Sequence, residues 1–176
     1  MNAPSTRSLP RRVSSLGGGA LLAVLILSLI GCFNATAKKV IVGANDVQDG
    51  AKNAYNEAKA QTVAAGKACG DAARAATPPV TPTLEACAAL GILIPYDPAK
   101  LNKLEGPINA AYETIRSAEA VRLAWTKGKA GKADVIVQVT LALEAISRFV
   151  TAANDIGIDI DRSAIDAIVQ KWEGVK

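Results

Sequence analysis

The sequence predicts an all-α protein, a small bundle of four to five helices that follows an apolar N-terminal segment. Half of the 176 residues are hydrophobic, but aromatic residues make up only 4%. Much of the remaining hydrophobic content is alanine, the strongest helix former. Apolar residues recur at the three- and four-residue spacing of helices, and no stretch alternates as a strand would. Because alanine buries little apolar surface, we expect a thin core and modest stability.

The N-terminal segment has the layout of a secretory signal. Arg7, Arg11 and Arg12 precede an apolar run over residues 16–30, which ends in small residues. A membrane-spanning helix needs about 20 apolar residues, whereas this run is shorter and opens with three glycines. An uncleaved anchor, extended from Val13 to Phe33, stays open as the alternative.

The run closes on Leu29-Ile30-Gly31-Cys32, which resembles the lipobox of bacterial lipoproteins. The resemblance implies that residues 1–31 are a signal peptide cut before Cys32, and that Cys32 is then lipidated. Residues 32–43 would be a lipidated tether, and residues 44–176 a helical domain. The family also implies anchoring on the periplasmic side. Phe33 stands where an aspartate would retain the protein at the inner membrane, so the outer membrane is favoured.

Removal of the leader changes the charge of the chain. The full sequence carries a formal charge of +4, but residues 32–176 hold seventeen basic and sixteen acidic residues, which leaves +1. Nucleic-acid binding requires several clustered phosphate contacts. A nearly neutral domain therefore excludes nucleic acid as an expected partner.

Two cysteines remain after Cys32, and export predicts that Cys69 and Cys87 form a disulfide in an oxidising compartment. The loop that they close contains the proline-rich break at 78–82. In the chain-entropy model a crosslink over such a loop stabilises by about 3 kcal/mol. The alternative is a pair of buried thiols in separate helices.

The first half of the domain predicts one long and one short helix. A helix over about 45–76 is stopped by Thr77-Pro78-Pro79, and a short helix over 82–90 has Thr81 as its expected cap. The apolar connector 92–96 is expected to be buried. Val40-Ile41-Val42, before the long helix, either dips toward lipid or packs on its own domain.

The second half predicts three further helical stretches. Asp97-Pro98 is a cap followed by a proline in the first turn, and Gly106-Pro107 kinks or restarts that segment, which ends near Lys127. A lysine-rich turn at 127–132 precedes the most apolar helix, 133–154, which we expect to be central. Gly157 closes this helix, and Asp161 caps the last one, 162–172.

The chain offers little for catalysis or metal binding. It contains no histidine, which removes the usual general base and the usual zinc ligand. Asp159 and Asp161 begin a pattern similar to an EF-hand loop, but Ala164 and Gln170 occupy the glycine and glutamate positions. We therefore expect no enzyme activity, no catalytic residue, no cofactor and no bound metal, and we interpret Asp161 as a helix cap.

The sequence thus favours a non-catalytic, lipid-anchored envelope protein that acts through protein contacts in the periplasm. A phage- or prophage-encoded envelope lipoprotein that blocks a receptor or modifies the host is an alternative, as is a carrier of small apolar ligands. The turn at 127–132 either faces anionic headgroups or is a solvated helix connection, the reading we favour. Trp125 and Trp172 belong either to the core or to a partner surface. The oligomeric state stays open.

Overall fold

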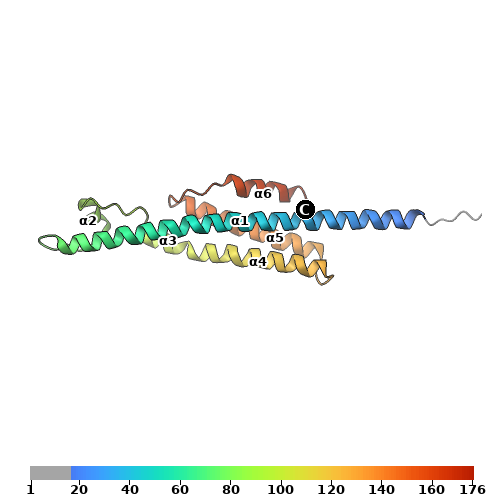
Figure 1. The fold of residues 1–176 in the computed structure, drawn as a ribbon, viewed down its shortest axis with the longest axis horizontal. Helices are drawn as coiled ribbons and strands as arrows, with labels where there is room; N and C mark the ends of the chain where they lie inside the picture. The colour runs from blue at the N-terminus through green and yellow to red at the C-terminus, as the bar shows by residue number, and fades with distance from the viewer. Residues whose placement is uncertain (1–16) are drawn as a thin grey trace, which may run out of the picture. The chain divides into compact units, whose positions relative to one another are not determined.

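The computed structural model describes the backbone of residues 17–176 and the side chains of residues 31–176 (Figure 1). It confirms the all-α bundle, and the described residues contain no strand. Arg7, Arg11 and Arg12 lie outside the described residues. The helices are α1 (Gly17–Ala75), α2 (Leu84–Ala89), α3 (Pro98–Lys103), α4 (Glu105–Thr126), α5 (Lys132–Asn154) and α6 (Ser163–Glu173). The chain divides into two compact units, Met1–Phe33 and Asn34–Lys176, and in the first the described part is the beginning of α1.

The second unit starts earlier than the sequence led us to expect. Residues 34–43, predicted to belong to a tether, are helical, and Ala37, Val40 and Ile41 are buried. Together with Ala44 they follow the i, i+3, i+4, i+7 spacing of one helix face. The tether prediction is therefore wrong from residue 34 onward, and Val40 and Ile41 pack on their own domain.

Helices α4, α5 and α6 pack along the N-terminal half of the portion of α1 that belongs to the second unit. A hydrogen bond from Arg122 Nη1 to Asn34 Oδ1 (2.8 Å) and another from Tyr55 to Glu105 (3.3 Å) show that α4 runs antiparallel to α1. Ser117 Oγ donates to Gln138 Oε1 (3.0 Å), so α5 runs antiparallel to α4. The C-terminal helix α6 lies along the same bundle (Figure 1).

Helix α5 is the core helix that the sequence predicts. All six residues of its expected main stripe are buried, and so are Leu143 and Val150 of the neighbouring stripe. The stripe residues are Val135, Val139, Ala142, Ile146, Phe149 and Ala153. Within the described residues α5 is also the helix long and apolar enough to span a membrane, but its buried face packs against α4 and α6, which explains its composition.

Local signals define most helix ends. Asp97 Oδ1 accepts the Ala99 N–H (2.8 Å), as predicted, and Gly91 and Gly157 adopt the positive φ that turns after helices require. The cap of α2 is Thr83, not Thr81, because Thr83 Oγ1 accepts the Ala86 N–H (3.1 Å). The helix therefore starts two residues later than predicted.

The connector at 92–96 is not buried as expected. Leu93 is 81% exposed, while Ile92 and Ile94 are half-buried. Ile92 and Ile94 are therefore the partly buried members of the run, and Leu93 lies at the surface.

Candidate functional site

Cys32 lies within α1, exposed and outside the disulfide. One residue, Phe33, separates it from Asn34, the first residue of the compact second unit. Lipidation of Cys32 and cleavage before it stay predictions. The consequence of the fold is that an acylated Cys32 would join the bundle with almost no linker.

A buried arginine holds the start of this unit. Arg122, 6% exposed, donates to Asn34 and also forms a two-bond pair with Glu119, through Nε (2.7 Å) and Nη2 (2.6 Å). The hydrogen bonds to Glu119 raise the pKa of Arg122 above its ordinary value, against the opposing effect of burial. A planar guanidinium suits such a bidentate pair. Nothing in the sequence pointed to a contact between Arg122 and Asn34.

An apolar groove runs between α1 and α4, close to this arginine. Its volume is about 470 Å³. Val42 and Leu123 on its walls are 49% and 42% exposed, which is high for side chains of this size. The lining residues are Ile41, Val42, Asn45, Ile115, Arg116, Glu119, Ala120 and Leu123. This groove is the strongest candidate for a contact surface in the second unit.

The structure joins Cys69 to Cys87, with a Cα–Cα distance of 5.3 Å. Both residues are buried, and the bond ties the last turns of α1 to α2. The predicted pairing is therefore present, and the alternative of two separate thiols is not. Together, residues 60–91 form what we call the disulfide arm.

In the acidic stretch before α6, Asp161 binds the first residue of the helix. Asp161 Oδ1 accepts the Ser163 N–H (2.8 Å), and its Oδ2 accepts the Ser163 hydroxyl (2.9 Å). These bonds lower the pKa of Asp161. Within the described residues, no group of three histidine, cysteine, aspartate or glutamate side chains is placed to hold a metal ion. The N-cap of α6 is Arg162, which makes no side-chain cap bond, so Asp161 binds the start of the helix from one residue further out than the sequence predicts.

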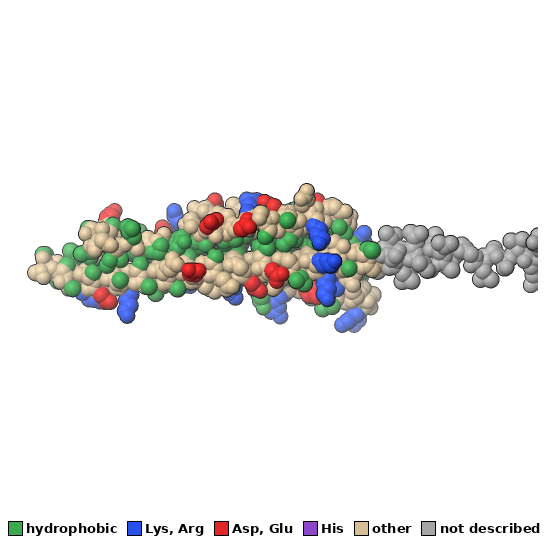
Figure 2. Space-filling view, turned by 45° about the horizontal axis from the view of Figure 1, so that its top comes forward, with side chains coloured by type: hydrophobic (Ala, Val, Ile, Leu, Met, Phe, Trp, Pro, Cys, Tyr) green, Lys and Arg blue, Asp and Glu red, His purple; other side chains and the backbone are tan. Residues whose placement is uncertain are grey.

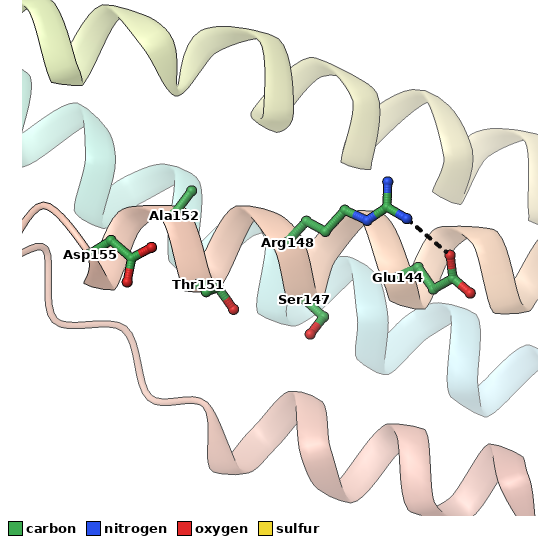
Figure 3. A pocket seen from close by; sticks show the side chains of 6 residues that line it. All are labelled: Glu144, Ser147, Arg148, Thr151, Ala152 and Asp155. Atoms are coloured by element: carbon green, nitrogen blue, oxygen red, sulfur yellow. Dashed lines mark hydrogen bonds and ion pairs between the residues drawn. The ribbon is translucent and has the colours of Figure 1, made fainter.

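A second, polar hollow lies along the exposed side of α5 (Figure 3). Glu144, Ser147, Thr151 and Asp155 follow one another along this single helix rather than converging on a point, and Arg148 pairs with Glu144 (3.5 Å). Such an arrangement lacks the mutual hydrogen-bond geometry of an acid–base or nucleophile pair.

One polar cluster in the structure was not predicted from the sequence. Lys59 Nζ lies 2.6 Å from Glu105 Oε1, and the Tyr55 hydroxyl donates to the same oxygen (3.3 Å). The bond from Lys59 lowers the pKa of Glu105, and burial raises the pKa of Tyr55. The cluster joins α1 to the first turn of α4. It is a connection between helices, and its members are too far apart in sequence to form a motif.

The two tryptophans differ in burial. Trp172 is 1% exposed, and its Nε1 donates to Thr140 Oγ1 (3.0 Å), which assigns it to the core. Trp125, near the C-terminus of α4, is half-buried.

Comparison with known proteins adds no family to this description. No protein-family model matches the chain, and neither the curated proteins nor the solved structures give a significant match.

Proposed function

We propose that this chain is a non-catalytic, lipid-anchored protein of the cell envelope, which acts through contacts with another protein on the periplasmic side. The observation that carries the proposal is Leu29-Ile30-Gly31-Cys32, placed directly before a compact helical unit. Acyl chains contribute about 0.8 kcal/mol per buried CH₂, and two or more make attachment stable. Phe33 after the cysteine favours the outer membrane as the site of attachment.

The disulfide supports export. Disulfides persist in the periplasm and outside the cell, and they are rare in the cytosol. Cys69 and Cys87 lie within bonding distance in the fold, so an oxidising compartment would keep them joined.

The α1–α4 groove is the surface that we assign to the partner. Ile41 lies seven residues, about 10 Å along the helix, from Asn34, so the groove faces the space just above the membrane. Its walls are mainly apolar, and Arg116, exposed at its rim, has no salt bridge within the described residues. We propose that this groove binds an apolar segment of a partner protein held in the same membrane. An acidic residue beside that segment would pair with Arg116. Confinement to one membrane raises the effective concentration, so a weak contact suffices.

Intact mass of the protein extracted from membranes tests the anchor. Acylation predicts the mass of residues 32–176 plus its acyl groups, and a shift on reduction reports the Cys69–Cys87 bond. The Cys32→Ser variant should keep its leader and lose the acyl mass. Recovery of the wild-type chain with an intact Met1 would support the uncleaved anchor and reject the lipoprotein.

Photo-crosslinking in cells tests the partner surface. A crosslinker at Val42 or Leu123 should capture one membrane protein, whereas a matched position, Val63, should not. Val63 is also an exposed valine of α1, 65% exposed, but it lies in the disulfide arm. Equal capture at Val63 and Val42 would remove the groove from the proposal.

The groove volume also favours a second candidate, a carrier of small apolar ligands. Ligand sites usually have volumes of about 300–1,000 Å³, and 470 Å³ lies in this range. Binding of an apolar fluorescent probe that is lost in Val42→Asp and kept in Val63→Asp would support the carrier. Retention of binding in both variants would reject this groove as the ligand site.

A further inference from the structure

One end of the second unit brings together parts of four helices. Arg122 donates to Asn34, so the C-terminal turns of α4 lie beside the start of this unit. The turn that follows α4 leads directly into α5. Trp172 donates to Thr140, which places the last turn of α6 beside the third turn of α5. We define the Asn34 end as residues 34–39, 119–134 and 171–176.

The Asn34 end is strongly basic. It holds eight basic and three acidic residues, whereas the rest of residues 32–176 holds nine basic and thirteen acidic residues. A domain with a net charge of +1 is therefore divided into an end of +5 and a remainder of −4. Figure 2 shows lysine and arginine side chains gathered there. Its exposed lysines are Lys38, Lys39, Lys127, Lys129, Lys132, Lys171 and Lys176.

The acidic residues of this end already have partners. Glu119 is paired with Arg122, Glu173 with Lys176, and the Asp134 carboxylate accepts the Gly131 N–H (2.7 Å). Within the described residues, by contrast, Lys38, Lys39, Lys127 and Lys129 form no salt bridge. These four ammonium groups are exposed to solvent, where they can attract an anionic surface.

The proposed lipidation, on which this step rests, holds the basic end close to lipid. Even a fully extended chain covers only about 7 Å from Cys32 to Asn34. The Debye length at physiological ionic strength is about 8 Å, so these charges interact with phosphate headgroups. Lys67 lies 33 residues further along α1, about 50 Å away, where the interaction is screened.

We propose that the Asn34 end is a docking surface for the anionic phospholipid bilayer in which the protein is anchored. The lysines lie against headgroup phosphates, and the rest of the bundle, which is net acidic, points away from the membrane. This arrangement fixes the orientation of the α1–α4 groove with respect to the bilayer. The sequence favours a solvated connection for the turn at 127–132. The structure adds two other basic segments beside that turn, residues 34–39 and 171–176.

The test measures lysine reactivity in the full chain, extracted from membranes and reconstituted into vesicles. One set of vesicles contains phosphatidylcholine alone, and the other contains phosphatidylcholine mixed with phosphatidylglycerol. A membrane-impermeant amine reagent and mass spectrometry give the reactivity of Lys38, Lys127 and Lys129 relative to Lys67 and Lys103 at the far end. The anionic vesicles should slow the first group about fivefold, the factor that corresponds to one basic residue near such a surface. High salt should abolish the difference. Equal relative reactivity in both vesicles would overturn the proposal.

A variant identifies the charges responsible. Substitution of Lys38, Lys39, Lys127 and Lys129 by glutamine removes exposed groups that form no salt bridge among the described residues, so the circular dichroism spectrum should not change. Lys171 then serves as the reporter, and its protection in anionic vesicles should disappear. A matched variant, with Lys67, Lys100 and Lys103 replaced by glutamine, should keep it. Loss of protection in both variants would reject the Asn34 end as the docking surface.

Two controls distinguish this proposal from the proposed lipidation and from binding to a soluble polyanion. The mass of the Cys32 peptide is read from the same sample, and an unmodified cysteine would reject the lipid anchor. In that case the uncleaved apolar leader would still hold the chain in the vesicle, so that docking of the Asn34 end could still be measured. Soluble polyphosphate is the other control. Equal protection of Lys129 by polyphosphate without vesicles would reject the assignment to a bilayer and favour a soluble polyanion.

Discussion

Two regions of the second unit are held together by different means. In the packed half, where α4, α5 and α6 surround α1, large apolar side chains such as Phe149, Ile146 and Trp172 are almost wholly buried. In the disulfide arm, the buried described residues are Thr62, Cys69, Ala73 and Cys87. Side chains this small contribute little hydrophobic stabilisation. Helix α1 can therefore extend beyond the packed core, because the Cys69–Cys87 bond stabilises this region in place of buried apolar side chains.

Truncation of the core should have the largest effect. Phe149→Ala removes a ring that is 0% exposed and leaves a cavity, so we expect the free energy of unfolding to fall by about 3–5 kcal/mol. Urea unfolding followed by circular dichroism measures this. Val137→Ala on the same helix is the control, because Val137 is 54% exposed and its truncation should cost less than about 0.5 kcal/mol. Similar losses in both variants would contradict α5 as the core helix.

Removal of the disulfide should act on the arm alone. In Cys69→Ala/Cys87→Ala, amide exchange should accelerate over residues 60–91 and stay unchanged at the buried positions of α5. The chain-entropy model gives about 3 kcal/mol for a loop of this size, and the arm has little apolar burial to offset that loss. Hydrogen exchange read by mass spectrometry distinguishes the regions. Equal acceleration in α5 would mean that arm and core unfold as one unit, and the comparison would fail.

The predictable part of the fold is the part with local signals. Helix α5 carries an apolar stripe long enough to define its buried face, and Asp97 caps α3 through contacts within three residues. Asp161 likewise binds Ser163, the first residue of α6, two residues further along the chain. Such signals need only the sequence nearby. The start of the second unit was missed because residues 34–39 contain two lysines and mostly small residues, which resemble a tether. Their burial depends on α4 and α6, which lie far along the chain.

The candidate site was less predictable for the same reason. Arg122 and Asn34 are 88 residues apart, and Lys59 and Glu105 are 46 apart. No spacing rule connects such pairs. The basic character of the Asn34 end likewise arises because three segments that are separate in the sequence meet there. The sequence showed only the cluster at 127–132.

Buried amides and hydroxyls offer a sharper comparison of the two regions. Gln48 in the packed half is 0% exposed, and Thr62 in the arm is 4% exposed. Neither the Gln48 side-chain amide nor the Thr62 hydroxyl has a hydrogen-bond partner among the described residues. An unsatisfied buried polar group costs about 1–3 kcal/mol, so Gln48→Leu should raise the free energy of unfolding by an amount in this range.

Thr62→Val is the matched change in the arm. It should slow amide exchange over residues 60–75 and leave the global free energy of unfolding almost unchanged, because the arm opens separately. Gln61→Leu, at an exposed position, is the control for added hydrophobicity. Stabilisation by Gln61→Leu as large as that by Gln48→Leu would show that the effect does not come from the buried amide.

The smallest effect should come from Asp161, whose carboxylate binds Ser163 at the start of α6. Because hydrogen bonds from Ser163 lower the pKa of Asp161 in the folded state, the unfolded chain takes up a proton first as the pH falls. The stabilisation is therefore complete above the ordinary carboxyl pKa of 3.8 and is lost as the pH drops through the lower, folded value. NMR titration of the carboxyl carbon should give a pKa below 3.8. Asp161→Ala should fray the first turn of α6, whereas Asp161→Asn keeps an acceptor for the Ser163 N–H and should preserve that turn without the acid dependence. An acid dependence that persists in Asp161→Asn would assign the effect to another carboxylate.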